Sequence, residues 1–290
     1  MRLNACVGAV LALTLGTLPV LALEPVELWE ATGLKTPESA LPDPSGTFAY
    51  VSNIDGDPTG KDGNGFISRI SLKDGKIEVL KWATGLDAPK GLALAGNRLY
   101  VSDIDQLVEI DADNGKIIKR YDAPGAKFLN DVAAGPEGKV YVSDMVANKI
   151  WRLADGKLQP WLDSAKLRSP NGIIVQDGNL IVGAWGVMAD GFATKVPGNL
   201  LTVSLADKQV KDLGDGSPVG NLDGVEPYDA THYLATDWMA GGLYLIDSAG
   251  KAEQLLDLKQ GSADIGWVPQ KHILLIPMMK DDKLVAYQLK

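Results

Sequence analysis

Cysteine and histidine are almost absent from this chain of 290 residues, which contains one Cys, Cys6, and two His, His232 and His272. A single thiol excludes an internal disulfide, and so few nitrogen and sulfur ligands disfavour a zinc site. We interpret both histidines as surface or strand-edge residues without a catalytic role. The sequence also lacks a GxSxG elbow, an HExxH pair, a phosphate loop and a GxGxxG turn. These absences remove the usual sequence evidence for serine hydrolases, zinc proteases and nucleotide-dependent enzymes.

Positive charge is scarce, because 28 Lys and Arg face 37 Asp and Glu and give a net charge of −9. An acidic chain without a basic run is a poor candidate for binding nucleic acid or an anionic membrane. The first 22 residues hold one cation, Arg2, and then an apolar run that ends in small residues near Ala22. This pattern predicts a signal peptide over residues 1–22, with Cys6 inside it. We therefore expect a soluble, monomeric, periplasmic or secreted protein comprising residues 23–290, with no disulfide and no membrane attachment.

Six segments share one pattern, in which a short apolar stretch, a turn rich in Gly, Pro, Asp or Asn, and a β-rich stretch follow one another. They read TPESALPDPSGTFAYVSN, APKGLALAGNRLYVSD, FLNDVAAGPEGKVYVSD, SPNGIIVQDGNLIVGA, NLDGVEPYDATHYLATD and SADIGWVPQKHILLIPM. A third apolar stretch follows each, such as Gly65 to Ile70, and usually a fourth, such as Lys76 to Trp82. Four short strands per unit are typical of a propeller blade. The sequence therefore predicts an all-β fold, a six-bladed β-propeller with four-stranded blades.

The sixth unit ends after its third strand, so one strand is missing from the last blade. The stretch Pro25 to Glu38 parallels Lys76 to Lys90, which contains the fourth strand of the first unit. We therefore expect Val26 to Trp29 to form the outer strand of the last blade and to close the ring, which also protects the strand edges.

Aligning the six units places one polar or charged residue at the start of each inner strand. These residues are Glu38, Lys90, Asn130, Asn171, Asp223 and Asp264. Because inner strands surround the axis of a propeller, we expect these side chains to form a ring on one face. Burying so many polar groups near one axis is costly unless they are paired or bind an ion. Asn171 alone, between Pro170 and Gly172, would indicate only a turn, and the six-fold pattern predicts that it faces the axis.

The oxygen-rich ring favours a hard cation. Glu38, Asn130, Asn171 and Asp223 would supply only oxygen ligands, which suit Ca²⁺ and, less well, Mg²⁺ or Mn²⁺. The stretch Asn53 to Phe66 looks like a calcium loop, but Phe66 stands where an EF-hand needs Glu. We therefore predict a divalent-cation site on the axis and none in this loop.

Two long links join the second and third strands of the first and fourth units, and lie opposite each other on the face of the ring. They span Asn53 to Phe66 and Ala184 to Gly198. Either they form a substrate groove, with Trp185, Met188 and Phe192 as apolar walls, or they are tolerated surface insertions.

A second set of polar residues ends the second strands. Its members are Asn53, Asp103, Asp144 and Asp237. We expect them, together with Asp264, to cap turns or support the ligands from behind and not to bind the ion themselves.

With these motifs identified, the chain resembles the senescence marker protein, gluconolactonase and luciferin-regenerating enzyme family of six-bladed propellers. The motif PES contains Glu38, SPNG contains Asn171 and LDG contains Asp223. In that family the corresponding Glu, Asn and Asp hold a divalent cation on the axis, so the resemblance implies that these three are metal ligands. LND resembles the family's FND motif and implies that Asn130 is a ligand or a substrate contact. The resemblance also implies lactone hydrolysis, with Asp223 as base or nucleophile.

Lys90 and Asp264 stand where many relatives have small or neutral residues. Lys90 has three possible roles: it pairs with Glu38 or Asp264 and weakens or replaces the metal, it binds a substrate carboxylate, or it transfers a proton. Three functions therefore remain open. We favour a metal-dependent hydrolase of lactones or esters in which Asp223, Asn130 and Lys90 act on a small-molecule substrate, over a binding propeller with a structural ion or a metal-free site.

Overall fold

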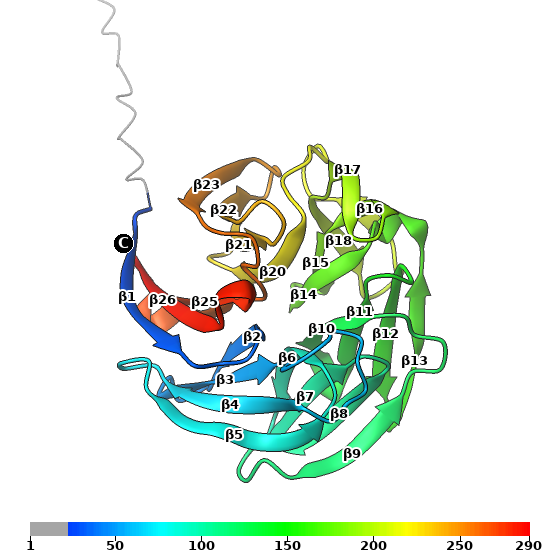
Figure 1. Ribbon diagram of the computed structural model, residues 1–290. Coiled ribbons are helices and arrows are strands. Elements are labelled where there is room, and N and C mark those ends of the chain that lie inside the picture. The colour runs from blue at the N-terminus through cyan, green and yellow to red at the C-terminus, as the bar shows by residue number, and fades with distance from the viewer. Residues whose placement is uncertain (1–22) are drawn as a thin grey trace, which may run out of the picture.

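The computed structural model describes residues 23–290, which form six four-stranded antiparallel sheets around a central axis (Figure 1). The predicted six-bladed β-propeller is thus confirmed. The predicted signal peptide, residues 1–22, lies outside the described residues. Within residues 23–290, no helix is both long and apolar enough to cross a membrane.

Each of the first three blades runs from its inner to its outer strand in chain order. These blades consist of β2 (Pro37–Pro42), β3 (Phe48–Asn53), β4 (Gly65–Ser71) and β5 (Ile77–Leu86); β6 (Pro89–Ala95), β7 (Arg98–Asp103), β8 (Gln106–Asp111) and β9 (Ile117–Asp122); and β10 (Leu129–Ala134), β11 (Val140–Asp144), β12 (Lys149–Ala154) and β13 (Lys157–Asp163).

The fourth blade carries an extra hairpin, and the sixth blade is built from both ends of the described chain. The fourth consists of β14 (Pro170–Gln176), β15 (Asn179–Ala184), β18 (Leu200–Ser204) and β19 (Val210–Asp212), with the hairpin strands β16 (Gly186–Asp190) and β17 (Ala193–Pro197) inserted after β15. The last two consist of β20 (Leu222–Pro227), β21 (His232–Asp237), β22 (Gly242–Asp247) and β23 (Ala252–Asp257); and β24 (Gly266–Val268), β25 (Ile273–Met278), β26 (Lys283–Leu289) and β1 (Pro25–Thr32). The connections contain the 3₁₀ turns η1 (Pro136–Gly138), η2 (Ala165–Leu167), η3 (Pro269–Lys271) and η4 (Met279–Asp281).

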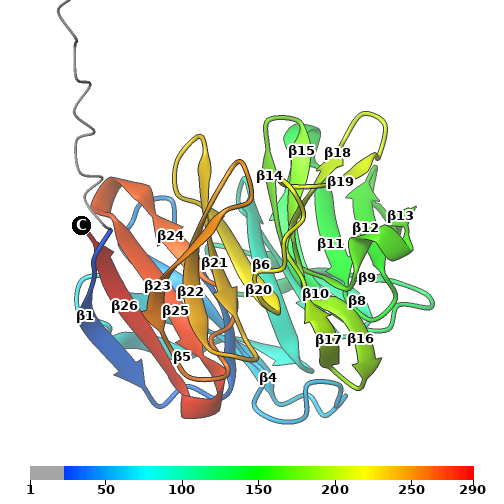
Figure 2. The same cartoon turned by 90° about the horizontal axis from the view of Figure 1, so that it is seen from above.

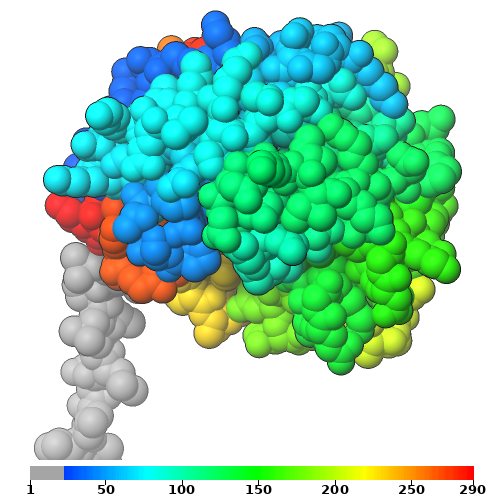
Figure 3. Space-filling model, turned by 90° about the horizontal axis from the view of Figure 1, so that it is seen from below, coloured from blue at the N-terminus to red at the C-terminus, as the bar shows by residue number. Residues whose placement is uncertain are grey.

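Burial falls from the axis outward, which explains why inner and middle strands are apolar and outer strands are mixed. In the second blade, β7 is almost entirely buried, whereas most of β9 is exposed. The core lies between blades: Leu99 and Val101 of the second blade cluster with Tyr50 and Ile67 of the first. A blade therefore buries its apolar faces only against its neighbours. In the space-filling view the first three blades, coloured cyan to green, lie side by side (Figure 3).

Strand β1 closes the ring, as the sequence predicts, by pairing antiparallel with β26. It is longer than the expected Val26 to Trp29. Ala31 at its end and Leu34 just beyond are buried in one cluster with Leu284 of β26. The first and last strands of the described chain therefore share one hydrophobic cluster.

The inner strands lie so close together that glycine is required directly after some ring residues. A Cβ atom added at Gly172 would lie 2.0 Å from the carbonyl oxygen of Asp223, and one at Gly224 would lie 2.3 Å from the amide nitrogen of Ile265. No side chain fits at these distances. The pairs Asn171-Gly172 and Asp223-Gly224 therefore arise from close strand packing and not from a tight turn.

Deleting residues 23–31 should lower the melting temperature by roughly 10 °C or more, because β26 loses its ladder and the apolar cluster at Ala31 opens. Thermal unfolding followed by circular dichroism measures the change. Val26→Ala, a truncation at an exposed position of the same strand, is the matched control and should change the melting temperature little. An unchanged melting curve after the deletion would contradict closure by β1.

Candidate functional site

Five of the six predicted ring residues lie together at the base of one axial pocket of about 160 Å³. They are Glu38, Lys90, Asn130, Asn171 and Asp223, each at most 5% exposed. Each is the second residue of the inner strand of its blade. The repeated strand geometry therefore aims five polar side chains from five blades at one point on the axis.

Asp264, the sixth predicted member, does not line this pocket. In the fifth blade the residue before the ring position, Leu222, pairs with the end of the second strand, and in the sixth blade the equivalent bridge joins Ser262 to Met278. The sixth ring position is therefore Ala263, which is fully buried. Because successive residues of a strand point to opposite sides, a shift of one residue directs Asp264 to the other mouth of the axis. The sequence alignment of this blade is wrong by one residue.

Three ring oxygens lack a hydrogen-bond partner although they are buried. They are Glu38 Oε2, Asn171 Oδ1 and Asp223 Oδ1. The side-chain nitrogen of Asn130, Nδ2, lies 3.8 Å from the Met145 sulfur, which leaves the side-chain oxygen of Asn130 for the pocket. Unpaired buried oxygens are costly, and oxygens from several strands that converge on one point suit a hard divalent cation. The residues present therefore fit the expected ion.

The charges at the site also favour a cation. Burial raises the pKa of Glu38 well above its usual range, and the negative charges of Asp223 and Asp264 raise it further. Burial and the charge of Asp264 likewise raise the pKa of Asp223. Within residues 23–290, no three His, Cys, Asp or Glu side chains gather in metal-binding geometry. The site has two carboxylates, so a complete ligand set depends on the amide oxygens of Asn130 and Asn171.

Lys90 is held by backbone carbonyl groups. Its ammonium group donates hydrogen bonds to the carbonyl oxygens of Pro58, at 2.8 Å, and Ala88, at 2.9 Å, and lies 4.6 Å from the centre of the Phe128 ring. Among residues 23–290 it forms no ion pair with Glu38 or Asp264 within 4.0 Å. Burial lowers the pKa of Lys90 to about 8, although the charge of Glu38 opposes this shift. Lys90 therefore fastens the long loop of the first blade at Pro58 and leaves the ring oxygens unpaired.

The polar residues that end the second strands hold the segments leading into the ring. Asp103 accepts a hydrogen bond from the amide nitrogen of Ala88 at 2.8 Å, and Asp144 accepts one from that of Phe128 at 3.0 Å. Asn53 accepts from Lys35 at 2.9 Å, and Asp237 accepts from two amide nitrogens of its own turn. Asp237 therefore caps its own turn, whereas Asp103 and Asp144 fix the backbone two residues before Lys90 and Asn130 and so support these ring positions from behind.

An apolar collar surrounds the polar base. It consists of the residue directly after the end of the second strand in each blade, namely Ile54, Ile104, Met145, Trp185, Trp238 and Met279. All but Ile104 line the pocket, and Phe128 complements them. Apart from Trp185, sequence reasoning missed this collar, although the same six-fold pattern contains it, with a large apolar residue at one position in every blade.

Both long links reach the site and project from the same face of the propeller (Figure 2). Pro58 of the first link and Phe192 of the β16–β17 hairpin line the pocket. Of the predicted wall residues, Trp185 and Phe192 face the pocket, and Met188 packs behind them against the buried cluster of Phe128, Met145 and Trp185. The links are therefore part of the pocket walls.

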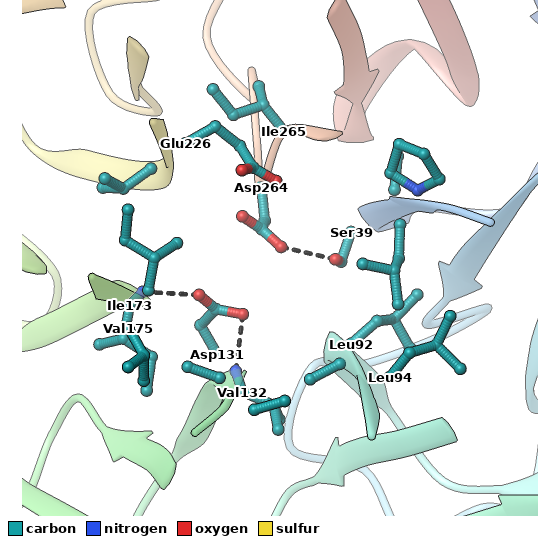
Figure 4. A pocket seen from close by; sticks show the side chains of 18 of the residues that line it. Ser39, Leu92, Leu94, Asp131, Val132, Ile173, Val175, Glu226, Asp264 and Ile265 are labelled. Carbon is teal, nitrogen blue, oxygen red and sulfur yellow. Dashed lines mark hydrogen bonds between the residues drawn. The ribbon is translucent and has the colours of Figure 1, made fainter. Parts of the chain in front are cut away.

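A second hollow, of about 320 Å³, opens at the other mouth of the axis (Figure 4). Asp131, Glu226 and Asp264 converge there. Asp264 accepts a hydrogen bond from the Ser39 hydroxyl at 2.5 Å, and Asp131 accepts from the amide nitrogens of Val132 and Ile173, both at 2.6 Å. Burial raises the pKa of Asp264 to about 7, and burial with the charge of Asp264 raises that of Glu226 to about 8.

Neither histidine lies near the axial pocket. His232 begins β21 and contacts Asp229 at 3.0 Å, and His272 follows η3 with its ring against Trp267. Both sit in turns between the first and second strands of their blades, at the face opposite the ring. Their positions agree with the interpretation that they are surface or strand-edge residues.

No protein-family model and no curated protein matches the chain. Solved structures with the same fold include a gluconolactonase from Xanthomonas campestris, with a TM-score of 0.65 and 17% identity over 90% of this chain and 88% of that one. They also include a putative gluconolactonase, with a TM-score of 0.66 and 17% identity over 93% of each chain. A streptogramin B lyase is similar, with a TM-score of 0.63 and 13% identity over 92% of this chain and 97% of that one. The expected likeness to gluconolactonases is thus confirmed for the fold, at low identity.

Stability should fall with rising pH because of Glu226. This carboxyl has a pKa of about 8 in the folded protein and an ordinary value of 4.5, so the folded state binds more protons between these values. The contribution of Glu226 to the free energy of unfolding is therefore most favourable below about pH 4.5, where the carboxyl is protonated in both states. This contribution is lost as the pH rises through about 8. Glu226→Gln stays neutral, and should reduce the loss of unfolding free energy between pH 6 and 9 by on the order of 2 kcal/mol.

Urea denaturation in the presence of a chelator measures this difference without interference from bound metal. Glu253→Gln removes an exposed carboxyl of β23 and is the matched control, with an expected pH profile like that of the natural chain. Identical profiles for the natural chain and Glu226→Gln would show that Glu226 titrates normally.

Proposed function

We propose that the protein is an exported, divalent-metal-dependent hydrolase of small lactones or esters, with the metal on the propeller axis. The observation that carries the proposal is the set of unpaired buried oxygens of Glu38, Asn171 and Asp223 at the base of a pocket. Several solved structures with this fold are enzymes, which supports a catalytic role. In this proposal the protein is exported and acts as a monomer in the periplasm or outside the cell. Its partner is a small molecule and not nucleic acid or a membrane.

Glu38, Asn130, Asn171 and Asp223 would hold the ion, most suitably Ca²⁺ and less well Mg²⁺ or Mn²⁺. When bound, such an ion polarises the carbonyl group of the substrate. Asn130 and Asn171 orient the carbonyl at the base of the pocket. Asp223 takes a proton from the attacking water, whose oxygen bonds to the carbonyl carbon.

The ester C–O bond then breaks, and the leaving oxygen needs a proton. Lys90 donates two hydrogen bonds to backbone carbonyl groups and keeps a third N–H for this oxygen. Burial lowers the pKa of Lys90 to about 8, so its ammonium form is populated at neutral pH and still gives up a proton readily. Asp223 returns its proton to Lys90 at the end of the cycle, through water.

The alternative is a non-catalytic binding propeller with a structural ion. Two points support it: the axial pocket is small, about 160 Å³, and this fold serves many unrelated functions.

Lyase chemistry has weaker support. A His-to-Ala variant of virginiamycin B lyase from Staphylococcus aureus, a structure with a TM-score of 0.59 and 16% identity, is catalytically inactive. Both His of this chain lie at the opposite face.

Calcium should raise both stability and lactone turnover, and Asp223→Ala should lower calcium-dependent turnover by about 10²-fold or more, because the base and one ligand are lost together. The assay follows acid release from a lactone panel, alongside the melting temperature with calcium and with chelator. Glu253→Ala, at an exposed carboxylate of β23, is the control and should leave both readouts unchanged.

Each negative result selects another function. Stabilisation by calcium without turnover of any lactone would favour the binding propeller. No bound ion in elemental analysis, together with no melting shift, would reject the metal site.

A further inference from the structure

The walls of the axial pocket contrast with its base. Oxygen atoms gather at the base, whereas the apolar collar, with Phe128 and Phe192, forms almost the whole wall. Four aromatic side chains follow one another around it. The ring centres of Phe128 and Phe192 lie 5.6 Å apart, those of Phe192 and Trp185 lie 6.2 Å apart, and those of Trp185 and Trp238 lie 6.1 Å apart. A substrate whose carbonyl reaches the base must therefore place the rest of its atoms against carbon and sulfur.

The polar atoms of the aromatic wall are occupied within the protein. The indole N–H of Trp185 donates to the carbonyl oxygen of Phe192 at 2.8 Å, and that of Trp238 lies 3.0 Å from the Met279 sulfur. The carbonyl oxygen of Trp185 accepts from the side chain of Asn221 at 2.7 Å. A hydroxyl group on the substrate would lose its water at this wall and gain no partner. Each such loss lowers affinity by about tenfold or more.

The volume limits the size of the buried part. An apolar cavity of about 150 Å³ in another protein holds one benzene molecule. The pocket here, about 160 Å³, therefore accommodates one six-membered ring or a short alkyl chain. Phe192 is 42% exposed at the rim, so the pocket opens between the two long links and a substituent can pass out there.

From these contacts we infer that the substrate is a small apolar lactone or ester, with an unsubstituted or alkyl-substituted single ring, and not a polyhydroxylated sugar lactone. This inference rests on the proposed hydrolase function and adds the substrate class. The collar and the aromatic wall are the specificity determinants, because they exclude water from the ring and offer hydroxyl groups no partner.

The test compares two lactones with the same six-membered ring ester, δ-hexalactone and glucono-1,5-lactone, on the mature chain with calcium. After subtraction of the uncatalysed reaction, we expect kcat/KM to be at least about 100-fold higher for δ-hexalactone, which lacks the hydroxyl groups. Phe192→Ala should raise KM for δ-hexalactone several-fold with little change in kcat, because Phe192 contacts the ring and not the reacting atoms. Ile118→Ala, at an exposed apolar position of β9, is the control and should change neither constant.

A binding measurement keeps the test independent of turnover. Cyclohexanone has the ring and the carbonyl group but cannot be hydrolysed, and Trp185 and Trp238 in the wall report its entry by a change in fluorescence. We expect a saturable change in the natural chain and in Ile118→Ala, with weaker binding in Phe192→Ala.

Equal or faster turnover of glucono-1,5-lactone would overturn the inference and leave the hydrolase function standing. Saturable binding of cyclohexanone without turnover of either lactone would overturn the hydrolase function and support an apolar binding pocket. Neither turnover nor binding would reject both.

Discussion

The close convergence of six inner strands on one axis is the constraint on which the rest of this structure depends. At Gly172 and Gly224 the next strand passes so near that no side chain fits. The preceding residues, Asn171 and Asp223, therefore point toward the axis, where one oxygen of each side chain is buried without a hydrogen-bond partner. Fold and site have one origin, because the packing that closes the ring also buries polar oxygens together.

Repetition made most of the fold predictable. The six related segments indicated strands, blades and closure by the N-terminal strand, and five ring residues followed from one alignment. The alignment of the repeats was wrong where the repeat is irregular. The sixth blade has a short inner strand, Gly266–Val268, and its ring position is Ala263, one residue before the predicted Asp264. Side-chain partners were also beyond the sequence: nothing in it shows that the Lys90 ammonium would meet the carbonyl group of Pro58 and not the carboxylate of Glu38.

The axis divides into zones of different chemistry, and strand alternation explains the division. Neighbouring residues of one inner strand, such as Asn130 and Asp131, point to opposite mouths. One mouth has unpaired oxygens below an apolar wall, and the other has carboxyl groups whose raised pKa values reflect burial beside each other. Two sites of unlike chemistry can therefore share one short strand.

Closure of the last blade by β1 and β26 also bears on how the chain folds. The strands that meet there, Pro25–Thr32 and Lys283–Leu289, lie at the two ends of the described chain. During synthesis, the first strand emerges long before its partner exists. Its apolar residues therefore cannot be buried against β26 until that last strand has been made. A chain that ends before β26 therefore lacks the pairing that closes the ring, and β1 keeps an unpaired edge.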